Sequence, residues 1–146
     1  MVLFGSLRAN GLGSAALSAA IAGLGTSALA AYLWWGPRDG VTVEGASATI
    51  VMVIGLAVLL AVGATAGLIS GRFRDAVVSW AAAVIGAVLV YQANYAIDPS
   101  WPRSDTPSEA YPLFAAVFLL PFIAGGHVLG ALIAKRTSLR TARPRA

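Results

Sequence analysis

Residues 47–69 read SATIVMVIGLAVLLAVGATAGLI, an unbroken run without Asp, Glu, Lys or Arg. Three further stretches of nearly the same length share this property: 14–35, 76–97 and 112–134. A helix needs about 20 apolar residues to cross the roughly 30 Å hydrocarbon core of a bilayer. Because the backbone must satisfy its own hydrogen bonds in that core, each stretch is predicted to be a transmembrane helix.

The composition excludes most other classes of protein. Of the 146 residues, 58% are hydrophobic and only 11% are charged, whereas about 25% are charged in a typical soluble domain. We therefore predict an all-α integral membrane protein, with one four-transmembrane-helix antiparallel bundle over 1–135 and a basic tail over 136–146. The short connection 70–75 predicts that the second and third spans pack against each other as antiparallel neighbours. The Ala- and Gly-rich, Lys-poor composition is typical of a GC-rich prokaryotic genome.

Basic and acidic residues lie on opposite sides of the four spans. Eight of the ten basic residues precede the first span, lie in 70–75 or follow the fourth span, and five of the six acidic residues lie in the other two connections. Lys and Arg accumulate on the cytoplasmic side of membrane proteins. We therefore expect a protein of the cytoplasmic (plasma) membrane with both termini in the cytoplasm.

The basic residues near the C-terminus are expected to bind the headgroups of anionic lipids. They are Lys135, Arg136, Arg140, Arg143 and Arg145. No aromatic residues interleave them and no nucleic-acid-binding motif is present, so nucleic acid is not an expected partner.

The chain contains a candidate internal repeat that relates the second span to the fourth. Four residues of the second span region recur at one constant offset: Ala61, Gly63, Gly67 and Arg72 correspond to Ala124, Gly126, Gly130 and Lys135. One interpretation is a duplicated helical hairpin, which would form a parallel repeat about an axis along the membrane normal. The other is that two hairpins of the same topology share glycines and basic ends without duplication.

Small residues recur at the spacing of one helical face. Such residues let helix backbones approach closely in lipid, where the hydrophobic effect does not drive association. The glycines predicted to form packing faces are Gly55, Gly63, Gly67, Gly71, Gly126 and Gly130. They are expected to pack the helices of one chain together, or alternatively to bind a partner subunit or a second copy.

Two residues of the fourth span carry further hypotheses. His127 is the only side chain within the spans that titrates near neutral pH, and the spans contain no carboxylate to orient it. It is interpreted as a structural histidine that bonds a helix carbonyl or a hydroxyl, with a pH-sensing or ion role and a haem ligand as alternatives. Pro121 is expected to kink this span, either as an ordinary bend or as the break of a binding site.

The residues favour a protein without enzymatic activity. The spans contain no carboxylate pair, no Cys and no Lys, so we find no catalytic constellation and predict no metal site and no resident cofactor. The favoured function is an accessory or structural subunit that packs within a membrane complex through its glycine faces. The alternatives are a homo-oligomeric channel or transporter with a pore between protomers, and a haem-bearing electron-transfer subunit that uses His127.

The absence of cysteine makes the predicted topology testable with single introduced cysteines. We expect a membrane-impermeant maleimide to label Ser104→Cys in intact cells, and to label Ser138→Cys only after the membrane is permeabilised. Labelling of Ser138→Cys in intact cells would contradict the cytoplasmic position of the C-terminus.

Overall fold

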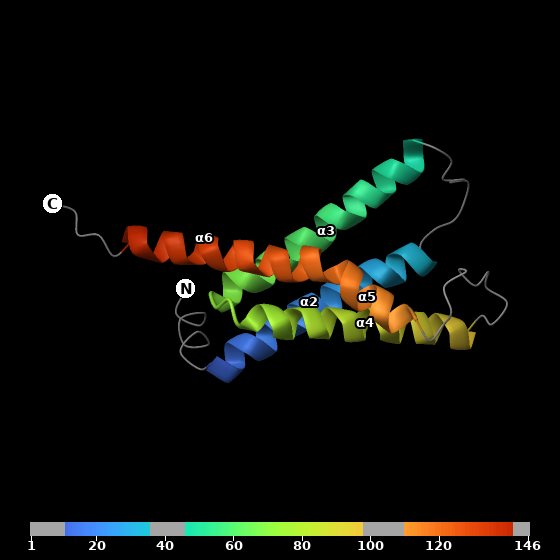
Figure 1. Cartoon of the computed structure of the whole chain (residues 1–146), viewed down its shortest axis with the longest axis horizontal. Helices are drawn as coiled ribbons and strands as arrows, with labels where there is room; N and C mark the ends of the chain where they lie inside the picture. Colours follow the sequence, from blue (N-terminus) through green and yellow to red (C-terminus); the bar gives the residue numbers. More distant parts are fainter. Residues whose placement is uncertain (1–10, 36–45, 98–109, 142–146) are drawn as a thin grey trace.

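The computed structural model describes residues 11–35, 46–97 and 110–141, which form helices joined by one short turn (Figure 1). The elements are α2 (Gly11–Trp35), α3 (Ala46–Ser70), α4 (Asp75–Ile97), α5 (Tyr111–Leu119), the π-helix η1 (Leu120–Ala124) and α6 (Gly125–Thr141). Since α5, η1 and α6 are continuous, the described residues form four helical spans that are long and apolar enough to cross a membrane. The predicted all-α four-helix bundle is confirmed. Successive spans run in opposite directions (Figure 1).

Alanines make up much of the interior of the bundle, together with Leu59, Leu119 and Ile123, and most large side chains lie on its surface. Ala22, Ala66, Ala83 and Ala131 are fully buried. Large aliphatic side chains on every span point outward, and Leu24 is 72% exposed. Water would penalise this distribution, because burial of large apolar side chains is the main driving force of folding there. It is the distribution expected of helices whose outer faces contact lipid and whose small residues permit close packing.

The turn between α3 and α4 depends on a glycine. Gly71 follows α3 with φ of 65°, a left-handed conformation that only glycine adopts without strain. Its amide donates to the carbonyl of Gly67 at 2.8 Å, which closes the end of the helix. The chain then reverses through 72–74 into α4. We call the end of the bundle that holds this turn the turn end.

The helices pair differently from the sequence expectation. The most extensive contacts join α2 to α4 and α3 to α6, and α3 touches α4 only slightly. Each main pair therefore consists of two helices that run in the same direction (Figure 1). The expectation that the short 70–75 connection makes the second and third spans packed neighbours is wrong. The connection holds their ends together, but the faces rich in small residues determine which helices pack along their length.

The pairing of α3 with α6 rests on reciprocal contacts of glycines. A Cβ atom added to Gly63 would lie 2.5 Å from the carbonyl oxygen of Ile123. A Cβ atom added to Gly126 would lie 2.5 Å from the carbonyl oxygen of Leu60. Real Cβ atoms do not approach oxygen so closely, so neither helix could hold this position with alanine at these sites.

A second pair of glycines repeats this arrangement one turn further along. A Cβ atom on Gly67 would overlap the backbone of His127, and one on Gly130 would overlap the backbone of Ala64. The offset that carries Gly63 onto Gly126 also carries Ala64 and Gly67 onto His127 and Gly130, so the Gly67–His127 contact corresponds to the Gly130–Ala64 contact. In the preceding pair, the Gly63–Ile123 contact corresponds to the Gly126–Leu60 contact in the same way. The crossing thus has the approximate two-fold symmetry that a duplicated hairpin predicts, which supports the repeat hypothesis.

The fourth span changes its helical form at Pro121. This residue lies in η1, where the chain follows a π-helix between α5 and α6, and the span bends there (Figure 1). Proline lacks an amide donor and cannot continue a regular α-helical hydrogen-bond ladder. The indole of Trp80 on α4 donates to the carbonyl of Ala116 at 2.8 Å and so holds α5 beside α4.

We expect Gly67→Ala to lower the free energy of unfolding by about 1–3 kcal/mol, because the added methyl group forces the α3 and α6 backbones apart. Gly125→Ala is the matched control, since a Cβ atom there meets nothing within 4 Å. Denaturant titration of the purified protein in detergent measures both. Equal stability of the two variants would contradict the close packing at Gly67.

Candidate functional site

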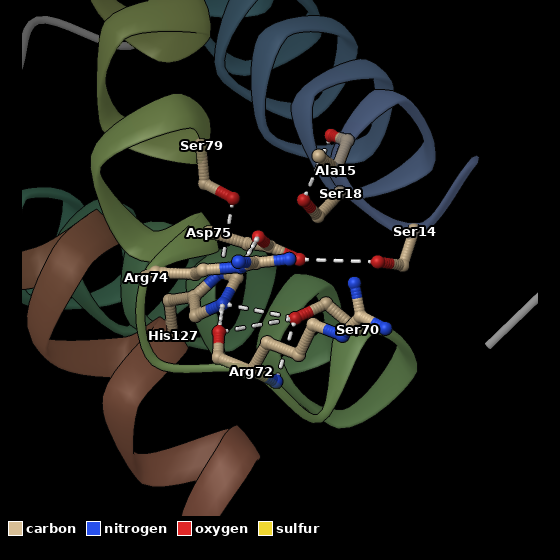
Figure 2. Close-up of polar contacts among 9 residues, drawn as sticks. All are labelled: Ser14, Ala15, Ser18, Ser70, Arg72, Arg74, Asp75, Ser79 and His127. Carbon is tan, nitrogen blue, oxygen red and sulfur yellow. Dashed lines mark hydrogen bonds and ion pairs between the residues drawn. The ribbon is translucent and has the colours of Figure 1, made fainter. Parts of the chain in front are cut away.

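The polar residues buried in the described part of the chain concentrate at the turn end (Figure 2). His127 of α6 is fully buried there. It follows Gly126, and its backbone lies against Gly67 of α3. Because these glycines carry no side chains, α6 comes close enough to α3 for the imidazole ring to reach the turn and the beginning of α4.

Both ring nitrogens of His127 have hydrogen-bond partners. Nδ1 lies 2.9 Å from Oγ of Ser79 on α4. Nε2 lies 3.0 Å from the backbone carbonyl oxygen of Arg72 and 3.3 Å from Oγ of Ser70. A carbonyl oxygen can only accept a hydrogen bond, so Nε2 carries the proton in this arrangement. In the neutral ring, Nδ1 then accepts a hydrogen bond from the hydroxyl of Ser79.

A buried carboxylate belongs to the same cluster. Asp75 is the first residue of α4 and is 3% exposed. It accepts a hydrogen bond from Ser14 of α2 at 3.2 Å, and Nε of Arg74 lies 3.8 Å from its other oxygen. A negative charge at the N-terminus of a helix is stabilised by the helix dipole. The Ser14 contact therefore attaches α2 to the beginning of α4.

Sequence reasoning missed this role of Asp75, because a charged residue beside a turn is normally assigned to water. One signal was present: Asp75 precedes Ser79 by one helical turn, so the two side chains share a helical face. The expectation that the spans contain no carboxylate to orient His127 concerned residues 76–97 of the third span, and Asp75 directly precedes them. Asp75 lies at the same end of the bundle as His127 (Figure 2), and the contacts that position the imidazole ring come from Ser79, Arg72 and Ser70.

The cluster has the properties of a structural clamp. Its hydrogen bonds connect α6 to α4 and to the turn, and connect α2 to α4. A hydroxyl beside a histidine ring is also the geometry of an activated nucleophile. However, Ser79 and His127 are both 0% exposed, so no substrate reaches either side chain in this arrangement. The geometry thus supports the structural interpretation of His127.

A haem or metal role for His127 finds little support in its surroundings. A haem ligand would need a free ring nitrogen, and both nitrogens are engaged in hydrogen bonds. No group of three or more His, Cys, Asp or Glu side chains comes together within the described ranges 11–35, 46–97 and 110–141. Ligation of iron would therefore require the clamp to open.

The six glycines proposed as packing faces have three different environments. Gly63, Gly67, Gly126 and Gly130 form the α3–α6 crossing. Gly71 lies in the turn, where it permits the positive φ. Gly55 has nothing within 4 Å of an added Cβ atom. Four of these glycines therefore pack helices of the same chain, one shapes the turn, and one faces open space.

The basic residues near the C-terminus begin inside a helix. Lys135 and Arg136 are exposed on α6, which continues to Thr141, so the helix does not end at the expected start of the tail. The ammonium group of Lys135 lies 5.5 Å from the centre of the Phe73 ring, a cation–π contact with the turn. Arg140 is within α6, and Arg143 and Arg145 lie outside the described residues.

Comparison with known proteins does not assign the chain to a family. No protein-family model, no curated protein and no solved structure matches the chain. The four apolar helices identify a small multi-pass membrane protein. Any finer function has to be argued from the contacts within the chain.

We expect His127→Leu to lower the free energy of unfolding by about 1–3 kcal/mol, because it leaves the buried Ser79 hydroxyl without its partner and removes one donor from the Arg72 carbonyl. Thr65→Val is the control, since this exposed hydroxyl bonds only the Ala61 carbonyl of its own helix. Denaturant titration in detergent compares the two variants. A His127→Leu protein as stable as the parent would contradict the clamp.

Proposed function

We propose that the chain is an accessory subunit without enzymatic activity, which binds a larger membrane protein through the first half of α3, residues 46–58. The observation that carries this proposal is the open space beside Gly55. The glycines of the α3–α6 crossing are already covered by backbone of the same chain, whereas Gly55 is a small residue with no neighbour. A second helix could approach the α3 backbone closely at this point.

The surroundings of Gly55 support such a contact. Ile50, Met52, Val53 and Ile54 are each 55–59% exposed. This half of α3 diverges from α2 and α4, while the other half crosses α6 (Figure 1). This half of α3 therefore offers an apolar surface, and Gly55 on it would let the backbone of a partner helix approach closely. Lipid can cover such a surface, but a partner helix gains dispersion contacts at the glycine that a mobile acyl chain does not keep.

The charge distribution supports an orientation for this subunit. With both termini in the cytoplasm of a prokaryotic cell, the turn end and the exposed Lys135 and Arg136 face anionic lipid headgroups. Because the basic residues begin on α6 itself, a rigid helix positions them at the membrane surface. The Gly55 surface then lies in the opposite half of the bilayer, away from these headgroup contacts.

The interior of the bundle favours the accessory role over a channel or transporter within one chain. Its only buried histidine among the described residues is held by three hydrogen bonds, and the α3–α6 crossing leaves no room between the backbones. A pore would therefore have to form between copies of the chain. This alternative predicts an assembly of identical subunits, which the following experiment separates from the proposal.

We expect native mass measurement after mild detergent extraction to find the chain in a fixed ratio with one unrelated membrane protein. Gly55→Leu should release the partner, because its side chain prevents close approach, while the chain itself remains folded. Gly125→Leu is the matched control, since Gly125 also has nothing within 4 Å of an added Cβ atom. A monomer, or an assembly of this chain alone, would contradict the proposal.

A further inference from the structure

A cavity of about 160 Å³ lies between α2, α3, α4 and α5, away from the histidine cluster. Leu59 of α3 and Ala87 of α4 line it, and the aromatic rings of Tyr111, Phe114 and Phe118 line it from α5. The cavity opens to the surface of the bundle, where Phe114 and Phe118 are 56% and 41% exposed. Its volume is close to the roughly 150 Å³ of an apolar cavity that binds benzene. The volume and the lining therefore suit a single six-membered ring.

One polar side chain in the cavity wall has no partner. Thr26 of α2 lines the cavity, is 3% exposed, and its hydroxyl oxygen has no hydrogen-bond partner. Other threonines of the bundle satisfy their hydroxyls within their own helix: Thr65 bonds the Ala61 carbonyl, and Thr137 bonds the Ile133 and Ala134 carbonyls. Buried polar groups are normally hydrogen-bonded, so an unpaired hydroxyl beside a cavity indicates a missing partner.

The hydroxyl of Thr26 can turn toward the cavity without movement of the backbone. Threonine in a helix occupies two side-chain rotamers, and rotation between them moves the hydroxyl to a different position around Cβ. A hydroxyl both donates and accepts, so it can bond either a carbonyl or a hydroxyl oxygen. A ring that carries a carbonyl or hydroxyl oxygen can therefore supply the partner that Thr26 lacks.

Aromatic side chains give the cavity a wall suited to a flat ring. Phe114 and Phe118 stack along α5, with ring centroids 5.7 Å apart and planes at 12°. Tyr111 stacks on Tyr91 of α4 at 4.0 Å, which holds the beginning of α5 against the bundle. Aromatic rings pack favourably against other rings in offset or edge-to-face arrangements.

We propose that this cavity is a binding site for the ring of a membrane-soluble molecule that carries a carbonyl or hydroxyl oxygen, and that Thr26 bonds this oxygen. Quinone-type carbonyl compounds and phenol-type hydroxyl compounds share this chemistry. The site is distinct from the partner surface over 46–58, because Leu59 is the residue of α3 that lines the cavity and the rest of its wall comes from α2, α4 and α5. It is also independent of the histidine clamp at the turn end.

Binding is measured with the purified full-length protein in detergent micelles. The probes are 4-fluorophenol and, as a ring without oxygen, fluorobenzene, followed by ¹⁹F NMR against empty micelles. We expect saturable binding of 4-fluorophenol about tenfold tighter than that of fluorobenzene, the difference that one added hydrogen bond provides. Competition with cyclohexanone and with phenol then distinguishes a carbonyl ligand from a hydroxyl ligand.

Three variants test the named residues. Thr26→Val should abolish the preference for 4-fluorophenol, whereas Thr65→Val, on the exposed surface, should preserve it. Ala30→Phe, a change at the cavity wall, should abolish saturable binding of both probes. Without ligand, Thr26→Val should be at least as stable as the parent, since it removes an unpaired buried hydroxyl.

The proposal is overturned if the probes only partition into micelles, or if Ala30→Phe binds them as the parent does. It is also overturned if Thr26→Val keeps the preference for the ring with oxygen. A Thr26→Val protein that is clearly less stable than the parent without ligand would show that the hydroxyl already has a structural partner. Helix content from circular dichroism verifies that each variant is folded.

Discussion

The close approach of the α3 and α6 backbones is the constraint on which the rest of the bundle depends. At Gly63, Gly67, Gly126 and Gly130, the backbone of one helix occupies the space in which the other would carry side chains. In lipid, dispersion between closely packed backbones replaces the hydrophobic effect as the source of association. Four glycines on two matching faces therefore decide that α3 pairs with α6 and not with α4, its neighbour in the chain.

This pairing also creates the polar cluster at the turn end. His127 follows Gly126, and only a backbone held this close to α3 brings its ring between Ser79 of α4 and the Arg72 carbonyl of the turn. The ring in turn gives the buried Ser79 hydroxyl a partner and donates a further hydrogen bond to the Arg72 carbonyl. Glycine packing and the histidine clamp thus stabilise the same arrangement, one through contact and the other through hydrogen bonds.

Two further surfaces arise where the packing ends. Beyond the crossing, α3 diverges from the other helices (Figure 1). Gly55 in this part of α3 has nothing within 4 Å of an added Cβ atom, which is the basis of the proposed partner contact. The π-helical bend at Pro121 turns α5 toward α4, where Trp80 and Tyr91 hold it. The cavity beside Thr26 lies between these elements. The first surface depends on the angle at which α3 crosses its neighbours, and the second on the irregular helix at Pro121.

The sequence by itself determined the existence, length and number of the spans, because a bilayer requires about 20 uncharged residues per helix and the chain has four such runs. It also identified the glycines, His127 and Pro121 as unusual, since each breaks the pattern of an ordinary apolar helix. Helix pairing was not accessible in this way: the short turn suggested that α3 packs on α4, and only the three-dimensional fit of small-residue faces selects α6. The burial of Asp75, the open side of Gly55 and the unpaired hydroxyl of Thr26 were decided by tertiary structure as well. Each depends on which other helix lies beside the residue. The sequence pattern indicates the face of its own helix on which a residue lies, but it does not indicate which helix covers that face.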